Sequence, residues 1–270
     1  MENHQTAALG VVQGITEVLP VSSTAHLLIF SWLLSWRDGG LDLAVWLHFG
    51  TLISILFCFR KEWAAIAGAL LLSARSGSFE SADAKMGAGL AITILPAAVC
   101  GLIFEDVVAG ALRHPVVVAG ALLAGSAALF AADRKKGKTK RLTSLSVKDC
   151  VFFGVAQSFA LVPGFSRSGV SIAGGMFLGY TREDSAKFAF MMGVPVITAA
   201  IARTVWKNGL VIPNESEFIA GTIAATLTGI VSIRFLLRFV RNRTYAPFVI
   251  YRVAIAALIL IFVQMRFFPF

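Results

Sequence analysis

The chain has 270 residues, of which 57% are hydrophobic and only 14% charged, and its mean hydropathy is +0.78. Because a soluble domain carries about 25% charged residues, this composition excludes an ordinary soluble protein and indicates an integral membrane protein. The formal net charge of +9 does not indicate a nucleic-acid partner, since the basic residues fall at the ends of apolar runs and form no basic aromatic face.

The first apolar stretch, residues 6–34, is interrupted before it is long enough to cross a bilayer. Pro20 and the hydroxyl cluster that follows it separate residues 6–19 from residues 24–34, and each piece falls short of the roughly 20 residues that a spanning helix needs. Broken backbone at membrane depth is tolerated only where protein buries it or where it lines a wet cavity. The stretch is therefore predicted to be a re-entrant helix hairpin that enters and leaves on one side.

Glu17 lies in the apolar first half of this hairpin. An ionisable side chain at membrane depth is either paired for structural reasons or functional, and here the functional role would be that of a metal ligand or a proton acceptor. Gln13 lies one helical turn earlier on the same face. Its amide can ligate or orient a partner but cannot act as a base.

Ser22, Ser23 and Thr24 follow Pro20 directly. Hydroxyls before a helix are ordinary N-caps, but three in a row exceed what one cap requires, and they lie at the positive end of a half-helix that attracts anions. Ser23 and His26 share a helix face, so the imidazole could activate the hydroxyl or protonate a leaving group.

Three apolar runs long enough to span the membrane follow, at residues 41–59, 86–104 and 115–132. His48 lies in the first of these runs without polar company and is interpreted as a satisfied helix histidine. A basic segment, residues 133–146, is predicted to be a linker on the cytoplasmic side that ends the first repeat, residues 1–132.

The second repeat, residues 147–270, opens on an echo of the first hairpin. Its letters GVAQSFALVPGFSRSGVS match GVVQGITEVLPVSSTAH, with Gly154 aligned to Gly10 and, after a one-residue gap, Pro163 aligned to Pro20. The echo indicates an internal duplication. Residues 147–178 are therefore predicted to form a second re-entrant hairpin.

Arg167 lies in this second hairpin, far from any position where its side chain could snorkel to water. It either forms a salt bridge to Glu17 or binds an anion, since its planar fork suits phosphate and Gly164 lets backbone N–H groups approach. No neighbouring cluster of carboxylates could neutralise a large cation, which favours an anionic ligand.

Three further apolar runs, at residues 185–206, 218–237 and 246–263, complete the second repeat. The fold class predicted is therefore all-α, with six transmembrane helices and two re-entrant hairpins. Because each half crosses the membrane an odd number of times, the halves have inverted topology. Most of the 24 basic residues collect on one side, which is then cytoplasmic, and the two hairpin tips meet from opposite sides.

These motifs resemble those of the undecaprenyl-diphosphatase family, also called bacitracin-resistance proteins. The resemblance covers almost the whole chain, including HFGTLISILFCFRKEW, ILPAAVCGLIFED and APFVIYR. It implies that Glu17, Ser23, His26 and Arg167 are catalytic, and that a substrate-binding set surrounds them: Gln13, Ser22, Thr24, Gly164, Ser166, Ser168 and Ser171. Two residues depart from the family pattern. Where the family has Glu or Gln, this chain has the amide Gln13, and Ser171 stands where threonine is usual.

The resemblance also implies the reaction, which is hydrolysis of undecaprenyl diphosphate to undecaprenyl phosphate at the outer face of the bacterial inner membrane. Mg²⁺ or Ca²⁺ is expected to bridge the phosphates and Glu17. Because Gln13 is an amide, the site has one carboxylate for the metal instead of two, and strong metal binding by the protein alone is not expected. Ser23, His26 or water could attack phosphorus, and a homo-oligomer is left open. The rival hypothesis is a flippase or another inverted-repeat transporter of an anion, which would have no use for a Ser/His pair.

Overall fold

The computed structural model describes residues 3–34, 36, 40–104, 107–108, 110–209 and 215–265. Within these ranges the chain is helical and forms no strand, so the predicted all-α class is confirmed. The helices, in chain order, are α1 (Asn3–Val18), α2 (Ser23–Leu33), α3 (Gly40–Cys58), α4 (Arg60–Ser76), α5 (Ala82–Ile103), η1 (Ala111–Arg113), α7 (Pro115–Arg134), η2 (Leu142–Ser144), α8 (Val147–Ser158), η3 (Phe159–Leu161), α9 (Arg167–Phe177), α10 (Arg182–Asn208), α11 (Glu215–Asn242) and α12 (Ala246–Gln264).

In the described part of the chain, five helices are long and apolar enough to cross a membrane: α5, α7, α10, α11 and α12. They correspond to five of the six predicted spans. On α3, only Val45–Cys58 is recognised as an apolar helix, and it is a shorter one, so the sixth span stays a prediction. The outer faces of the spans carry exposed apolar side chains, such as Val231 (67%) and Ile250 (69%), as a surface in contact with lipid requires.

Both predicted interruptions are present. α1 ends at Val18 and α2 begins at Ser23, while α8 gives way to η3 and a loop before α9 begins at Arg167. Ser22 (φ 79°) and Ser166 (φ 67°) adopt positive φ angles, which non-glycine residues rarely do. Each of these two serines places its side-chain oxygen within reach of a backbone N–H three residues on, in the manner of an N-cap.

The two positive-φ serines correct the alignment of the repeats. The spacing that relates Gly10 to Gly154 also relates Ser22 to Ser166, so these two serines align without the predicted one-residue gap. The prolines are not equivalent positions. Ser23 and Arg167 are equivalent instead, and both open the second helix of their pair.

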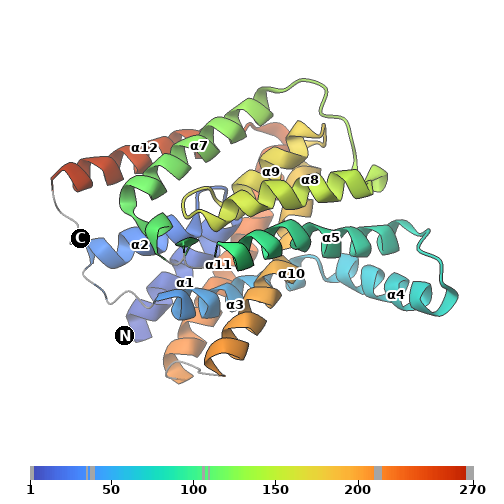
Figure 1. Ribbon diagram of the computed structural model, residues 1–270, viewed down its shortest axis with the longest axis horizontal. Coiled ribbons are helices and arrows are strands. Elements are labelled where there is room, and N and C mark those ends of the chain that lie inside the picture. Colours follow the sequence, from blue (N-terminus) through green and yellow to red (C-terminus); the bar gives the residue numbers. More distant parts are fainter. Residues whose placement is uncertain are drawn as a thin grey trace.

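The helix contacts between the two halves of the chain come in matching pairs, in which equivalent helices exchange roles. α1 packs against α11, and its counterpart α8 packs against α5, while α3 meets α10 and α7 meets α12. Figure 1 shows α7 and α12 side by side along one edge of the molecule, with α8 and α9 next to them. This exchange of partners matches the duplication that the sequence indicates, whereas the direction in which each hairpin enters a membrane stays a prediction.

The basic linker is docked onto the helices that it joins. Lys140 exchanges backbone hydrogen bonds with the segment after α9, donating to Gly179 and accepting from Thr181. Asp133, at the end of α7, pairs with Arg182 and accepts a hydrogen bond from the Tyr245 N–H at 2.8 Å. The end of α7 is thereby fixed to the beginnings of α10 and α12.

Candidate active site

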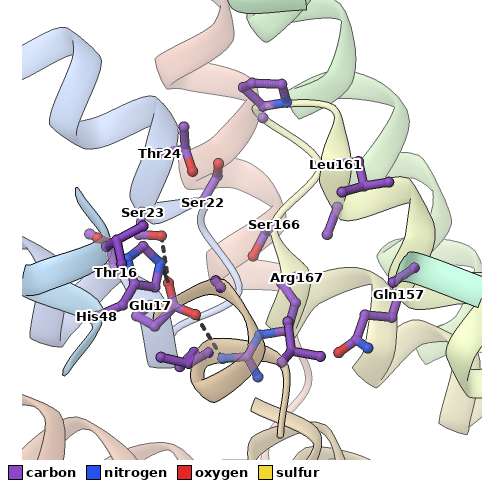
Figure 2. A pocket seen from close by; sticks show the side chains of 18 residues that line it. Thr16, Glu17, Ser22, Ser23, Thr24, His48, Gln157, Leu161, Ser166 and Arg167 are labelled. Atoms are coloured by element: carbon purple, nitrogen blue, oxygen red, sulfur yellow. Dashed lines mark hydrogen bonds and ion pairs between the residues drawn. The ribbon is translucent and has the colours of Figure 1, made fainter. Parts of the chain in front are cut away.

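Glu17 and Arg167 form an ion pair where the two interrupted helix pairs meet. Nη2 of Arg167 lies 2.7 Å from Oε1 of Glu17, and both side chains are largely shielded from solvent. Figure 2 shows the pair within the cavity, with Glu17 coming from the end of α1 and Arg167 from the start of α9. The sequence left a salt bridge and anion binding open as roles for Arg167. The salt bridge is formed, and the guanidinium also lines the cavity.

Ser23 donates its hydroxyl hydrogen bond to Oε2 of Glu17 at 2.6 Å. The same oxygen lies 3.3 Å from the Gln13 amide nitrogen and 3.2 Å from Nε2 of His48. One carboxylate thus organises a hydroxyl, an amide, an imidazole and, through its other oxygen, a guanidinium. A carboxylate in this position can both orient the Ser23 oxygen and accept its proton.

His26 does not contact Ser23 in the way that the sequence predicted. Its Nδ1 is 2.7 Å from the Ser22 carbonyl oxygen, and its Nε2 is 2.7 Å from the Tyr251 hydroxyl. An imidazole has only these two nitrogens for hydrogen bonding, so neither is left for the Ser23 hydroxyl. The prediction that Ser23 and His26 share a helix face was correct. The hydrogen-bond partner of the imidazole Nε2, however, is Tyr251 on α12.

His48 was missed as a site residue. It comes from α3, lies beside Glu17 and lines the same cavity. Figure 2 places its ring next to Glu17. The only signal in the sequence was its place in the segment HFGTLISILFCFRKEW, which contributed to the family resemblance but indicated no contact with Glu17.

The cavity has a volume of about 210 Å³. Among the predicted residues, its walls include Glu17, Ser22, Ser23, Thr24, Gly164, Ser166 and Arg167. Gln13, His26, Ser168 and Ser171 are buried behind these walls. Ser168 bonds to Ser166 and to the Leu19 carbonyl, whereas the Ser171 hydroxyl has no hydrogen-bond partner among the described residues.

Arg252 was also missed, although it lies in the segment APFVIYR. Its side chain is completely buried, and it donates hydrogen bonds to the carbonyls of Pro20, Leu122, Gly164 and Phe165 at 3.0–3.3 Å. No carboxylate pairs with it in the described part of the chain. Arg252 therefore ties the α1–α2 loop to the loop before α9, and holds both against α7.

The described side chains do not form a metal site by themselves. Among the described residues there is no group of three His, Cys, Asp or Glu side chains that could hold an ion. Both oxygens of Glu17 are already engaged by Arg167 and Ser23. The site thus offers at most one carboxylate to a cation, and the remaining ligands would have to come from elsewhere.

The fold and the site define a class of protein: a multi-pass helical membrane protein whose two interrupted helix pairs bring a carboxylate, a serine and an arginine to one cavity. Residues 6–258 match the family described as "Bacitracin resistance protein BacA", and the chain belongs to this family.

The curated relatives agree with one another. The chain is similar to the undecaprenyl-diphosphatase of Pelotomaculum thermopropionicum, with 37% identity over 98% of both chains. It is 37% identical to that of Elusimicrobium minutum over 98% of this chain and 100% of the relative. It is 39% identical to that of Thermodesulfovibrio yellowstonii over 93% of both chains.

Proposed function

We propose that this protein is an undecaprenyl-diphosphatase. It hydrolyses undecaprenyl diphosphate to undecaprenyl phosphate and inorganic phosphate, recycles the lipid carrier for peptidoglycan synthesis and confers bacitracin resistance. The observation that carries the proposal is the contact of Glu17 with both Ser23 and Arg167, in a chain whose full-length relatives bear this name.

In the first step, the Ser23 oxygen attacks the terminal phosphorus while the Ser23 proton passes to Glu17. The bond between that phosphorus and the bridging oxygen breaks, and undecaprenyl phosphate leaves. Arg167 binds the terminal phosphate and stabilises the charge that develops on its oxygens. Because each terminal nitrogen of a guanidinium carries two N–H groups, Arg167 can contact phosphate without releasing Glu17 completely.

In the second step, water attacks the phosphoserine and phosphate leaves, which restores the Ser23 hydroxyl. Glu17 returns the proton that it took in the first step to the Ser23 oxygen as this oxygen leaves phosphorus. His48, whose Nε2 lies 3.2 Å from Oε2 of Glu17, takes the proton of the attacking water. His26 has a supporting role in this scheme, because its ring holds Ser22 and Tyr251 in place.

A divalent cation, Mg²⁺ or Ca²⁺, would arrive with the diphosphate and take one ligand from Glu17. The diphosphate oxygens would supply most of its other ligands, because the described residues offer so few. Such an ion would neutralise phosphate charge. The roles of Ser23, Glu17 and Arg167 given above do not depend on it.

The topology belongs to the same proposal. The proposed arrangement has six spans and two hairpins in inverted repeats, lies in the bacterial inner membrane and opens the cavity to the periplasmic side. The support for this arrangement is the positive-inside distribution of Lys and Arg and the exchange of helix contacts between the halves.

Phosphate release by the purified protein from undecaprenyl diphosphate tests the activity, with Arg167→Lys as the matched variant. Arg167→Lys keeps the charge but loses the bidentate fork, and should lower turnover at least about tenfold, or roughly 1.4 kcal/mol. A chelator should lower activity, and added Mg²⁺ or Ca²⁺ should restore it. If the protein instead moved the lipid from one leaflet of a vesicle membrane to the other without releasing phosphate, the rival transporter hypothesis would hold. That hypothesis leaves the Ser23–Glu17 contact without a role.

A further inference from the structure

An apolar groove runs along the surface of the second interrupted helix pair, apart from the site cavity. It has a volume of about 260 Å³ and lies between α7, α8 and α9. The described residues that line it are all apolar, and none of them lines the site cavity. Phe152 (43%), Val155 (48%) and Phe159 (55%) are exposed along it. In the proposed topology these side chains face lipid.

The groove is concave because small residues meet where α8 and α9 touch. A Cβ atom on Gly174 would lie 2.9 Å from Cβ of Ala156 and 3.8 Å from the ring of Phe152. Larger rings stand around these small residues. Phe159 and Phe165 approach each other at one end of the groove, with ring centroids 5.8 Å apart. An apolar chain lying in such a groove contacts protein on its floor and on both sides.

The groove is about as long as one lipid leaflet is thick. Phe165 and Phe177 both line it and flank α9 from its beginning to its end. α9 has 11 residues, which rise about 16 Å. The hydrocarbon core of a bilayer is about 30 Å thick, so half of it corresponds to about 15 Å. An acyl chain from a single leaflet therefore matches the groove in length.

Two lysines mark the Phe177 end of the groove. The Lys135 ammonium, two turns beyond Ala128 on α7, donates a hydrogen bond to the Phe177 carbonyl. Lys148 lies one turn before Phe152 on α8, on the helix face that lines the groove. Both lysines are exposed. The apolar groove thus ends beside positive charge at one end only, as a site for a lipid with an anionic headgroup requires.

The neighbouring carboxylates do not cancel this charge. Asp133 and Asp149 lie next to these lysines in the chain, but both are buried and paired, with Arg182 and Lys140 respectively. Figure 1 shows the end of α7 and the start of α8 on the same side of the molecule, joined by the linker. The positive-inside rule places this side in the cytoplasm, where the leaflet surface carries negative charge.

We propose that this groove binds one anionic phospholipid of the cytoplasmic leaflet. Lys135 and Lys148 hold its phosphate, and one acyl chain lies between α7, α8 and α9 as far as Phe165. The lipid binds apart from the substrate, since the groove shares no lining residue with the cavity that holds Ser23. Because Phe165 precedes Arg167 by two residues, the bound chain supports from its lipid side the loop that carries Arg167.

The test uses the unmodified protein in phosphatidylcholine vesicles with two photoreactive lipids. One probe is a phosphatidylglycerol and the other a phosphatidylcholine, each with a diazirine at the end of the same acyl chain. The phosphatidylglycerol probe should label peptides containing Phe159 and Phe165 at least fivefold more, because one lysine near an anionic surface contributes about 1 kcal/mol, or about fivefold. Both probes should label the exposed face of α5 around Leu95 and Leu102 equally.

Two results with the unmodified protein would overturn the proposal. Equal labelling of the groove peptides by the two probes would show that the headgroup is not recognised. Labelling of α5 without labelling of the groove would show that something else covers it, such as a second copy of this chain. Competition separates the lipid classes: unlabelled phosphatidylglycerol should displace the probe, and stronger displacement by undecaprenyl phosphate would assign the groove to the carrier lipid instead.

Charge variants test the headgroup contacts. Lys135→Gln/Lys148→Gln should bring the labelling ratio of the two probes to within about twofold of one, because both cations are lost. Lys148→Gln alone, which leaves the Lys135 hydrogen bond to α9 in place, should lower the ratio at least about twofold. The control Arg75→Gln/Lys85→Gln removes the same charge from exposed positions outside the groove and should keep the ratio. Equal loss in the control would overturn the proposal.

Ala128→Trp tests the acyl-chain contact, because it places an indole in the groove without changing the charge. It should abolish the excess labelling by the phosphatidylglycerol probe and leave the labelling of α5 unchanged. Full excess labelling in Ala128→Trp would contradict a chain bound along α7. These measurements detect lipid binding and not phosphate release, so failure of this proposal and failure of the proposed function are distinguishable.

Discussion

At the scale of single residues, the site is organised by Glu17 more than by any serine–histidine pair. Its carboxylate contacts Ser23 and Arg167 directly and has His48 within 3.2 Å. The expected partner of Ser23, His26, is held by Ser22 and Tyr251. The proton of the nucleophile therefore has a short path to Glu17 and none to His26.

This arrangement predicts that Ser23→Ala abolishes hydrolysis while the diphosphate still binds at Arg167. Glu17→Gln should also abolish it, whereas His26→Gln, which keeps hydrogen-bonding capacity next to Tyr251, should retain more activity than either. Rapid acid quench with terminally labelled substrate, followed by peptide mapping, should find the label on Ser23. Label on His26, or substantial turnover by Ser23→Ala, would contradict the assignment.

Arg252 acts at the same scale but without contact with the cavity. It is fully buried and satisfies carbonyls from both interrupted loops and from α7. Gly169 leaves space for the guanidinium, since a Cβ atom there would be 2.8 Å from Nη1 of Arg252. Arg252 is a positioning residue because it holds the loops that carry Ser23 and Arg167.

Arg252→Lys should lower both stability and kcat. A single ammonium group cannot reach carbonyls on three segments, and each buried carbonyl left unpaired costs about 1–3 kcal/mol. Thermal unfolding in detergent and kcat at saturating substrate would measure the two effects, with the exposed Arg238→Lys as control. An Arg252→Lys protein with the stability and kcat of the unmodified chain would show that the four hydrogen bonds do not position the loops.

At the scale of secondary-structure elements, the start of α8 is stabilised by a polar cluster around Asp149. Asp149 closes a capping box with Ser146 and accepts hydrogen bonds from Lys140 at 2.6 Å and Tyr180 at 2.8 Å. Burial alone would raise the pKa of Asp149, but the hydrogen bonds from Lys140, Ser146 and Tyr180 outweigh it and hold the pKa below its ordinary value of 3.8. The cluster thus attaches the linker to the second hairpin.

Asp149→Asn should weaken this attachment by about 1–3 kcal/mol. Since the folded-state pKa is depressed, the stabilisation by ionised Asp149 is complete above the ordinary pKa and is lost as the pH falls through the folded-state value. The rate of tryptic cleavage in the linker should therefore rise in Asp149→Asn at neutral pH. The unfolding midpoints of Asp149→Asn and of the unmodified chain should become more similar as the pH is lowered. Equal cleavage of Asp149→Asn and the exposed-site control Glu80→Gln would count against the cluster.

At the scale of the whole molecule, neither half contains a complete site. Glu17 and Ser23 come from the first repeat, Arg167 comes from the second, and Arg252 near the end of the chain holds both loops. The two ends of α10 face opposite surfaces in the proposed topology. Its beginning is paired with Asp133 beside the linker, and its end reaches Asn208.

The orientation can be tested with single cysteines in a variant that lacks Cys58, Cys100 and Cys150. The exposed positions Lys136 and Lys207 lie near the linker and near the far end of α10, respectively. An impermeant maleimide added to whole cells should label Lys207→Cys but not Lys136→Cys, because the positive-inside rule places the linker in the cytoplasm. The reverse pattern would overturn the orientation, and equal labelling would indicate dual insertion.

The sequence by itself determined the class of protein, the interruptions before Ser23 and Arg167, and the two buried charges. These features follow from local terms: apolar length, proline without an N–H, and the cost of an ionised group in hydrocarbon. A resemblance of motifs was sufficient for the family. It could not assign partners to the side chains, since residues on one helix face can still point to different neighbours.

Only the tertiary structure decided which groups meet. The spacing of Ser23 and His26 was compatible with a contact, but Tyr251 of α12 binds the imidazole and Glu17 accepts the Ser23 hydroxyl. His48 and Arg252 gave no local signal, because their partners lie far away in the chain and come together only when α3 and α12 pack against the loops. Long-range packing fixes these contacts, and periodicity within a single helix carries no information about them.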